Sequence, residues 1–282
     1  MMRMLRATES TLSSGYRKAP ASAVESPCPS SVASSAFRQA CNVPDGARLL
    51  IVSDRGSRGR AVRFNKPGLL IGRHSECDIR IAHPSVSRYH AFVQAMDDYI
   101  CVNDLGSRTG IVAYDRIQGA AWLRPGDHFR IGPEVLRFES TQAREEGGTT
   151  ALGLLRDERS SPLFRLEFAN GRSPGGVSGW LVDRRITLIG AHPLCKLQLQ
   201  HETVRRFHAA LICTGQQLWI TRIGANASVD VDGASCETVE LQPGAEISIG
   251  RFRFRVAIDM DAAAIRLAEE TAVESTLVSY SD

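Results

Sequence analysis

An internal repeat constrains this chain more than any other feature of its sequence. Sliding the sequence by 118 residues brings residues 72–91 onto residues 190–209 without a gap, and eight of the twenty positions are identical. The same offset aligns residues 123–132 with residues 241–250, where five of the ten positions are identical. A pitch this long indicates two tandem domains of one fold rather than a solenoid of small units.

Short apolar runs predict that both domains are built from strands. From residue 47 onward, runs such as LLIV, HAFVQAM and VLRFES alternate with turns rich in Gly, Pro, Asp, Asn and Ser. Their spacing of roughly 8 to 12 residues is typical of a β-sandwich. We therefore predict an all-β protein with two tandem β-sandwiches and disordered or weakly structured tails.

The same pattern sets the expected domain bounds. Residues 1–46 are rich in Ser, Ala and Pro and hold few large apolar side chains, so they are predicted to be disordered. The predicted order is an N-terminal tail (1–46), a first domain (47–140), a linker (141–161), a second domain (162–259) and an acidic C-terminal tail (260–282), in which 262–270 could form a short helix.

Charge and cysteine content exclude several classes of protein. The net charge of +3 is too small to argue for binding to nucleic acid or to a membrane surface, and no apolar stretch approaches the length of a membrane span. The seven cysteines are odd in number and never form Cys-x-x-Cys, which disfavours a disulfide framework and a zinc ribbon. Reduced thiols in a cytoplasmic protein are the expected outcome.

Four motif blocks occur in order within the first repeat: Gly72-Arg73, Cys77-Asp78-Ile79, Ser87-Arg88-Tyr89-His90, and the stretch NDLGSRTG at 103–110. Together they resemble a forkhead-associated (FHA) domain. That family is a β-sandwich that binds phosphothreonine peptides through loops at one end. The resemblance covers about residues 47–140, and the repeat extends it more faintly to 162–259.

The chemistry of these residue types agrees with what the resemblance implies. A phosphothreonine carries about −1.5 to −2 charges and three strong acceptor oxygens, so its receptor needs cationic forks and short donors. By resemblance, Arg73 and Ser87 contact the phosphate, and Arg88 and Arg108 touch phosphate or peptide backbone. The implied phosphopeptide-binding residues are Arg73, Ser87, Arg88, Ser107, Arg108 and Thr109, and the residues expected to support the site are Gly72, His90, Gly106 and Gly110.

Two of these positions have alternative interpretations. Thr109 stands where the family's turn usually has Asn, and its hydroxyl is shorter and has fewer donors, so affinity or peptide selectivity is expected to differ. Arg88 is either a ligand contact or a scaffold residue, because Arg206 occupies the same place in the second repeat.

The histidines invite a metal or catalytic interpretation, which we reject. A zinc site needs three or four converging ligands, and nucleophilic catalysis needs a nucleophile with an oriented base. The resemblance instead makes His90 a buttress that hydrogen-bonds the loop carrying Ser87, and His74 and His83 are expected in turns. We expect no enzyme activity, no metal and no cofactor.

The second repeat matches the first at its scaffold positions but not at the expected phosphate positions. The replacements are Ala191 for Arg73, Arg205 for Ser87, and Ala225, Asn226 and Ala227 for Ser107, Arg108 and Thr109. We expect a domain kept for packing or for another partner. A relocated anion site at Arg205 and Arg206 is the alternative.

The function predicted from the sequence is that of a phosphothreonine-binding adaptor in Ser/Thr kinase signalling, with the second domain as a platform. The expected partners are a phosphothreonine-containing protein and a Ser/Thr protein kinase, without nucleic acid or membrane. The chain's own phosphorylated tail is a further candidate ligand, through Thr8, Thr11, Thr149, Thr150, Thr271 or Thr276. The alternative function is a structural or dimerising FHA-like scaffold without phosphate recognition.

Overall fold

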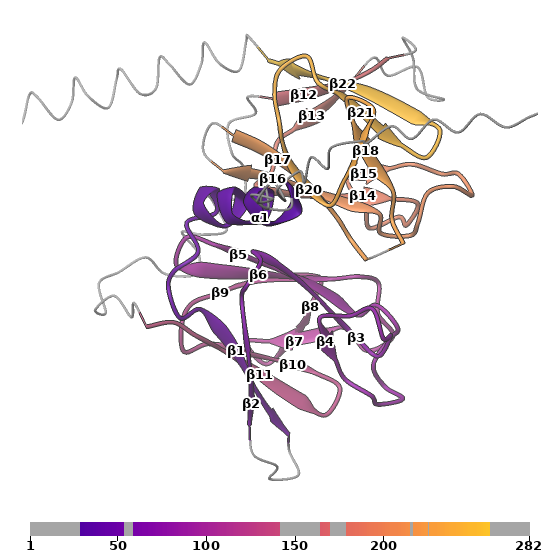
Figure 1. Cartoon of the computed structure of the whole chain (residues 1–282). Helices are drawn as coiled ribbons and strands as arrows, with labels where there is room; N and C mark the ends of the chain where they lie inside the picture. The colour runs from indigo at the N-terminus through magenta and orange to yellow at the C-terminus, as the bar shows by residue number, and fades with distance from the viewer. Residues whose placement is uncertain are drawn as a thin grey trace, which may run out of the picture.

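The computed structural model describes residues 29–53, 59–141, 164–169, 179–214, 217–224 and 226–259. Figure 1 shows two β-sandwiches, one above the other, with the helix α1 (Pro29–Ala40) lying between them. The prediction of an all-β chain with two tandem sandwiches is confirmed. The predicted linker beyond residue 141, the C-terminal tail, its possible helix and the candidate threonines of both tails lie outside the described residues.

The N-terminal sandwich consists of two sheets, with strand orders β2-β1-β11-β10-β7-β8 and β4-β3-β5-β6-β9. Apart from β4, which pairs parallel with β3, its paired strands run antiparallel. The strands are β1 (Arg48–Ser53), β2 (Arg60–Arg63), β3 (Gly68–Gly72), β4 (Ile79–Arg80), β5 (Ala91–Met96), β6 (Tyr99–Asp104), β7 (Ile111–Ala113), β8 (Arg116–Gln118), β9 (Ala120–Leu123), β10 (His128–Ile131) and β11 (Glu134–Glu139).

The C-terminal sandwich has sheets with strand orders β13-β12-β22-β21-β18-β19 and β15-β14-β16-β17-β20. Its strands are β12 (Phe164–Phe168), β13 (Gly179–Val182), β14 (Ile186–Gly190), β15 (Leu197–Gln198), β16 (Ala209–Thr214), β17 (Gln217–Arg222), β18 (Val229–Val231), β19 (Ala234–Cys236), β20 (Thr238–Leu241), β21 (Glu246–Ile249) and β22 (Phe252–Ile258).

The 118-residue offset of the sequence holds for the strands from β3 onward. Every strand from β3 to β11 begins 118 residues before its counterpart from β14 to β22. The parallel pairing of Ile71 with Ile79 recurs as that of Ile189 with Leu197. The loops between these strands therefore have equal lengths in the two domains, so one backbone scaffold carries two sets of loop side chains.

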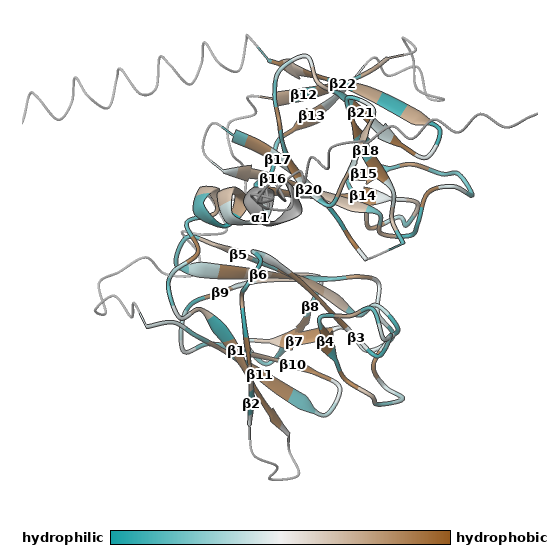
Figure 2. Ribbon diagram, in the orientation of Figure 1, coloured by the Kyte–Doolittle hydropathy of each residue, from teal (hydrophilic) through white to brown (hydrophobic). Residues whose placement is uncertain are grey.

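Strand β5 is buried along its whole length because both of its faces are covered. Ala91, Val93 and Ala95 point into the core of the N-terminal sandwich. Phe92 and Met96 point the other way, into a second apolar cluster that lies between the two sandwiches. Figure 2 shows hydrophobic residues along strands of both sandwiches and on α1. An apolar run of this kind is expected where a sheet is covered on both sides.

The cluster between the domains joins the outer faces of the β4-β3-β5-β6-β9 and β15-β14-β16-β17-β20 sheets, with α1 packed beside them. The ring of Phe37 in α1 lies 5.1 Å from that of Trp219 in β17. The buried residues of this cluster include Phe37, Cys41, Leu70, Phe92, Met96, Trp122, Leu188, Phe207, Ala210, Ile212 and Trp219.

The helix corrects one prediction from the sequence. Residues 1–46 were expected to be disordered, yet Pro29–Ala40 is helical. Phe37 and Cys41 are buried between the sheets, and the amide of Gln94 lies 3.5 Å from the Cys41 sulfur. The composition of the segment is too polar for a core of its own, but two apolar side chains suffice when the two domains supply the rest of the packing.

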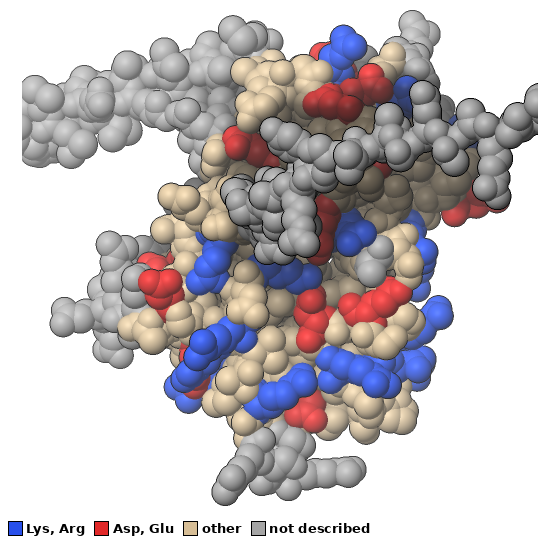
Figure 3. All heavy atoms as spheres, viewed as in Figure 1, with Lys and Arg blue, Asp and Glu red and all other residues tan. Residues whose placement is uncertain are grey.

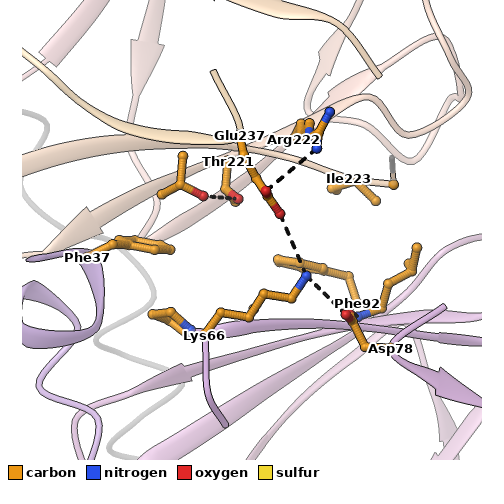
Figure 4. Close-up of a pocket in the computed structure, with 13 residues that line it drawn as sticks. Phe37, Lys66, Asp78, Phe92, Thr221, Arg222, Ile223 and Glu237 are labelled. Carbon is orange, nitrogen blue, oxygen red and sulfur yellow. Dashed lines mark hydrogen bonds and ion pairs between the residues drawn. The ribbon is translucent and has the colours of Figure 1, made fainter. Parts of the chain in front are cut away.

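Polar contacts flank the apolar junction. Figure 4 shows Lys66 between two carboxylates, with its Nζ 3.0 Å from Asp78 Oδ1 and 3.9 Å from Glu237 Oε1 of the other domain. Elsewhere on the junction, Arg185 Nη2 lies 2.5 Å from Asp97 Oδ2. Such exposed or half-exposed pairs fix the orientation of the domains more than they stabilise them.

Two further observations concern the described residues as a whole. None of their helices is both long and apolar enough to cross a membrane. Their six cysteines are thiols rather than members of disulfides, and five of these are buried.

Shortening a side chain in the junction should destabilise the protein. Ile212 is fully buried there. Ile212→Ala is expected to lower the free energy of unfolding by about 2 to 5 kcal/mol in urea titration, because it leaves a cavity between the sheets. The control Ile117→Ala, at a side chain that is 73% exposed, should change it by less than about 0.5 kcal/mol. Equal stability of the two variants would contradict the packed junction.

Candidate functional site

Three loops of the N-terminal sandwich meet at one end of it. They are the β3–β4 loop (73–78), the β4–β5 loop (81–90) and the β6–β7 loop (105–110). The Arg73 N–H donates to the Ser87 carbonyl at 3.0 Å, and the His74 N–H donates to the Arg88 carbonyl at 3.0 Å. These two bonds bring the first two loops together and place Arg73 beside Ser87.

Glycines allow this close approach. A Cβ atom on Gly72 would overlap the carbonyl oxygen of Arg88, so no other residue fits without moving the loop. Gly106 and Gly110 have φ angles of 59° and 70°, a left-handed backbone conformation that favours glycine. The structure thus places the three glycines where the loop geometry requires them.

The buried imidazole of His90 links two of the loops. Its Nδ1 accepts the Ser87 N–H at 3.1 Å, and its Nε2 lies 3.0 Å from the Gly110 carbonyl oxygen, to which it donates. This pattern requires the neutral ring with its hydrogen on Nε2. Burial lowers the pKa of His90 below its ordinary value, although the bond to Gly110 and the charge of Asp104 act in the opposite direction.

The Ser87 hydroxyl is held in place by one hydrogen bond that it accepts, and it can still donate one. Its Oγ accepts the Arg108 N–H at 3.0 Å, which joins the third loop to the second. A hydroxyl has one hydrogen to donate, and among the described residues no acceptor takes the hydrogen of Ser87. Ser87 can therefore donate a hydrogen bond to a bound anion.

Ser107 and Thr109 use their hydroxyls within the protein. Ser107 Oγ donates to Asp104 Oδ1 at 2.5 Å and accepts the Gly110 N–H at 2.9 Å. Thr109 Oγ1 donates to the Ser85 carbonyl at 3.3 Å. Both were predicted to bind the ligand. In this arrangement their hydrogens stabilise the turn and its contact with the neighbouring loop instead.

Exposed arginines lie on the loops around Ser87. Arg73, Arg88 and Arg108 are all exposed, and in the described part of the chain none of them pairs with a carboxylate. Arg73 and Arg108 line one hollow together with Arg80. Figure 3 shows basic side chains interspersed with acidic ones over the N-terminal sandwich. The hollow offers guanidinium groups to an anion.

Arg80 was missed in the sequence analysis. Its Nε donates to the Arg73 carbonyl at 3.3 Å, so it both supports and extends the basic hollow. A signal was present, because Ile79 and Ile81 are the buried positions of the run and alternation directs Arg80 outward, next to Arg73.

The other histidines behave as turn residues. His83 Nδ1 lies 2.7 Å from Ser85 Oγ, and the ring of His74 packs against that of Tyr89 with centroids 5.1 Å apart. Among the described residues no three His, Cys, Asp or Glu side chains gather in a way that could hold a metal ion.

Comparisons with known proteins decide the family. The FHA domain model matches residues 69–132 and 187–250, one stretch in each sandwich. The chain is 32% identical over 97 residues to the oxoglutarate dehydrogenase inhibitor of Corynebacterium glutamicum, a match that covers 34% of this chain and 68% of that protein. The chain belongs to the FHA-domain family.

Two further matches have partial coverage. The chain is 35% identical over 92 residues to the transcriptional regulatory protein EmbR of Mycobacterium tuberculosis. This match covers 32% of this chain and 24% of EmbR. A solved structure of EmbR in complex with a low affinity phosphopeptide is 21% identical, covers 38% of this chain and 28% of that one, and has a TM-score of 0.31.

The state of His90 leads to a prediction about pH. Because its folded pKa lies below its unfolded value, the folded protein binds fewer protons, and stability is full above the unfolded value of about 6.5 and falls as the pH drops below it. His90→Gln should lower the free energy of unfolding near pH 7.5 by about 1 to 3 kcal/mol, because the Ser87 N–H and Gly110 carbonyl lose well-placed partners. The substitution should also reduce the fall in the free energy of unfolding that occurs between about pH 7.5 and pH 5.5.

Urea titrations at the two pH values measure this effect. The control His128→Gln, at an exposed position of β10, should keep the pH dependence of the unchanged protein. A His90→Gln protein with unaltered stability and pH dependence would show that the imidazole does not tie the loops together.

Proposed function

We propose that this FHA protein is a phosphothreonine-peptide-binding adaptor in Ser/Thr kinase signalling, and that its N-terminal domain holds the phosphate. The observation that carries the proposal is the pairing of Arg73 with Ser87. One backbone hydrogen bond brings these residues together, and the serine hydroxyl keeps its hydrogen for a ligand. The family resemblance supports the proposal, because it implies phosphate contacts at the same two positions.

The proposed chemistry is charge-assisted hydrogen bonding. The planar guanidinium of Arg73 presents a fork of donors that matches phosphate oxygens, and the Ser87 hydroxyl donates to another oxygen. Arg108 and Arg80 line the same hollow and add positive charge. A dianionic ester gains more from this arrangement than a carboxylate does, because it brings more charge and more acceptor oxygens.

Arg88 is assigned to the ligand rather than to the scaffold alone. Its carbonyl belongs to the loop backbone, accepting the His74 N–H, whereas its side chain is exposed. Its guanidinium is therefore free to meet phosphate or peptide backbone beside the phosphate. We leave the Ser107 side chain out of the ligand set, since its hydrogen is donated to Asp104.

The C-terminal FHA domain is proposed to act as a platform. The outer face of its sheet packs against the N-terminal domain, and this packing supports a structural role. The proposal includes the remaining expectations from the sequence: no catalysis, a cytoplasmic location, a Ser/Thr kinase as the source of the phosphate, and either another protein or the chain's own phosphorylated tail as the ligand.

Removing the Arg73 guanidinium tests the proposal. Arg73→Ala should weaken binding of phosphothreonine peptides by roughly 10- to 150-fold, because charge-assisted hydrogen bonds contribute about 1.5 to 3 kcal/mol. Isothermal titration calorimetry with a phosphothreonine peptide library, and the unphosphorylated library as a control, measures the effect. Arg137→Ala, on the exposed side of β11, is the matched arginine control and should bind like the unchanged protein.

An Arg73→Ala protein that keeps its fold and its dissociation constant would exclude this role for Arg73. If neither phosphorylated nor unphosphorylated peptides bound to the unchanged protein, the alternative of a scaffold without phosphate recognition would replace the proposal.

A further inference from the structure

The C-terminal FHA domain keeps the backbone and histidine hydrogen bonds that hold the loops of the N-terminal one. The Ala191 N–H donates to the Arg205 carbonyl at 2.9 Å, as the Arg73 N–H does to that of Ser87. His208 accepts the Arg205 N–H at 3.1 Å through Nδ1, and its Nε2 lies 2.8 Å from the Ser228 carbonyl. This scaffold therefore presents Arg205 at the position of Ser87.

The loops at the end of the N-terminal sandwich and the equivalent loops of the C-terminal sandwich line one cleft. The residues that line it from the N-terminal domain include Arg73, Ser87, Arg88 and Arg108, and those from the C-terminal domain include Arg205, Arg206 and Asn226. The proposed phosphate site and the two arginines of the second repeat thus line a single cleft.

A quasi-twofold relation between the domains accounts for the shared cleft. Gly106 lies directly against the His192 imidazole of the other domain. Its counterpart Gly224, 118 residues later, lies near the Glu76 carboxylate of the first domain. Equivalent loops therefore contact each other in both directions, as in an isologous dimer interface. Such an arrangement places the two equivalent loop ends on the same side.

Hydrogen bonds across the cleft hold Arg205 next to the N-terminal site. Its Nε donates to the Asn226 carbonyl at 3.0 Å, and the Asn226 amide donates to the Glu76 carboxylate of the other domain. Glu76 also accepts the Tyr89 hydroxyl at 2.8 Å, and Tyr89 follows Arg88 in the chain. The Arg205 guanidinium is oriented by this chain of bonds while its terminal nitrogens keep their hydrogens.

The charge of the cleft favours an anion. Its basic side chains are the five arginines already named, and its acids are Glu76, Glu202 and Asp230. Glu76 is engaged by Asn226 and Tyr89. Among the described residues, Arg205 and Arg206 form no ion pair with a carboxylate. Unpaired guanidinium groups in a concave site are suited to phosphate or carboxylate.

We propose that Arg205 and Arg206 bind a second anionic side chain of the same peptide whose phosphothreonine is held by Arg73 and Ser87. The ligand class is a peptide that carries a phosphothreonine and, further along, a phosphorylated or carboxylate residue. This inference rests on the proposed function. Once the phosphothreonine is bound, the second group is at high effective concentration, so even a modest second contact raises the affinity.

Peptides with one or two anionic groups test this inference on the full chain. One peptide carries a phosphothreonine alone, and a series adds a phosphoserine or a glutamate at spacings from about three to about twelve residues, since an extended chain spans about 3.3 Å per residue. Dissociation constants are measured by calorimetry for the unchanged protein and for the double variant Arg205→Ala/Arg206→Ala. The matched control is Arg253→Ala/Arg255→Ala, at two exposed arginines of β22.

At the best spacing, the second phosphate should tighten binding to the unchanged protein and to the control by about 10-fold or more. In the double variant this gain should fall below about twofold, while the affinity for the singly phosphorylated peptide changes by less than about twofold. A smaller gain with glutamate than with phosphoserine is expected from its lower charge.

No gain at any spacing in the unchanged protein, or a gain that persists in the double variant, would overturn the inference while leaving the proposed function in place. Failure of the singly phosphorylated peptide to bind would overturn both. The melting temperatures of the variants establish that each protein is folded.

Discussion

The two hydrogen bonds of the buried His90 imidazole hold the proposed binding site together. One bond fixes the backbone of Ser87, and the other fixes Gly110 at the end of the neighbouring turn. The ring must be neutral to make both bonds. Burial favours this neutral form, because it lowers the pKa of His90. Arg73 and Arg108 reach the same hollow only because these loops are held at a fixed distance from each other.

The second domain shows which parts of this arrangement are scaffold. His208 makes the same two bonds as His90, and a Cβ on Gly190 would overlap the Arg206 carbonyl, as one on Gly72 would overlap that of Arg88. The scaffold is thus retained while the side chains it presents have changed. Packing the outer faces of two sheets together leaves both loop ends on one cleft, so the changed side chains lie next to the unchanged site.

The sequence predicted the fold well because the evidence for it was local. Turn residues and apolar alternation indicated strands, and the 118-residue offset of the motif blocks holds for the strands from β14 to β22. The motif blocks placed Arg73 next to Ser87. The direction of the Ser107 hydroxyl could not be predicted, because it depends on Asp104, which becomes its partner only in the folded turn.

The contact between the domains could not be predicted in the same way. In β5, Phe92 and Met96 lie on the face that meets the other domain, and nothing in the sequence says which surface covers that face. The helix α1 was missed for a related reason. The helix is stabilised by the contact of Phe37 with Trp219, a residue far along the chain. Helix propensity depends on the residues of the segment alone and does not include such a contact.

A crystal structure of the full chain with a bound phosphothreonine peptide would locate the phosphate directly. We expect phosphate oxygens within about 2.7 to 3.2 Å of the Arg73 guanidinium and of the Ser87 hydroxyl. We also expect the peptide to extend from there into the cleft shared with the C-terminal domain. A phosphate bound elsewhere on the protein, with Arg73 and Ser87 facing only water, would contradict the proposed site.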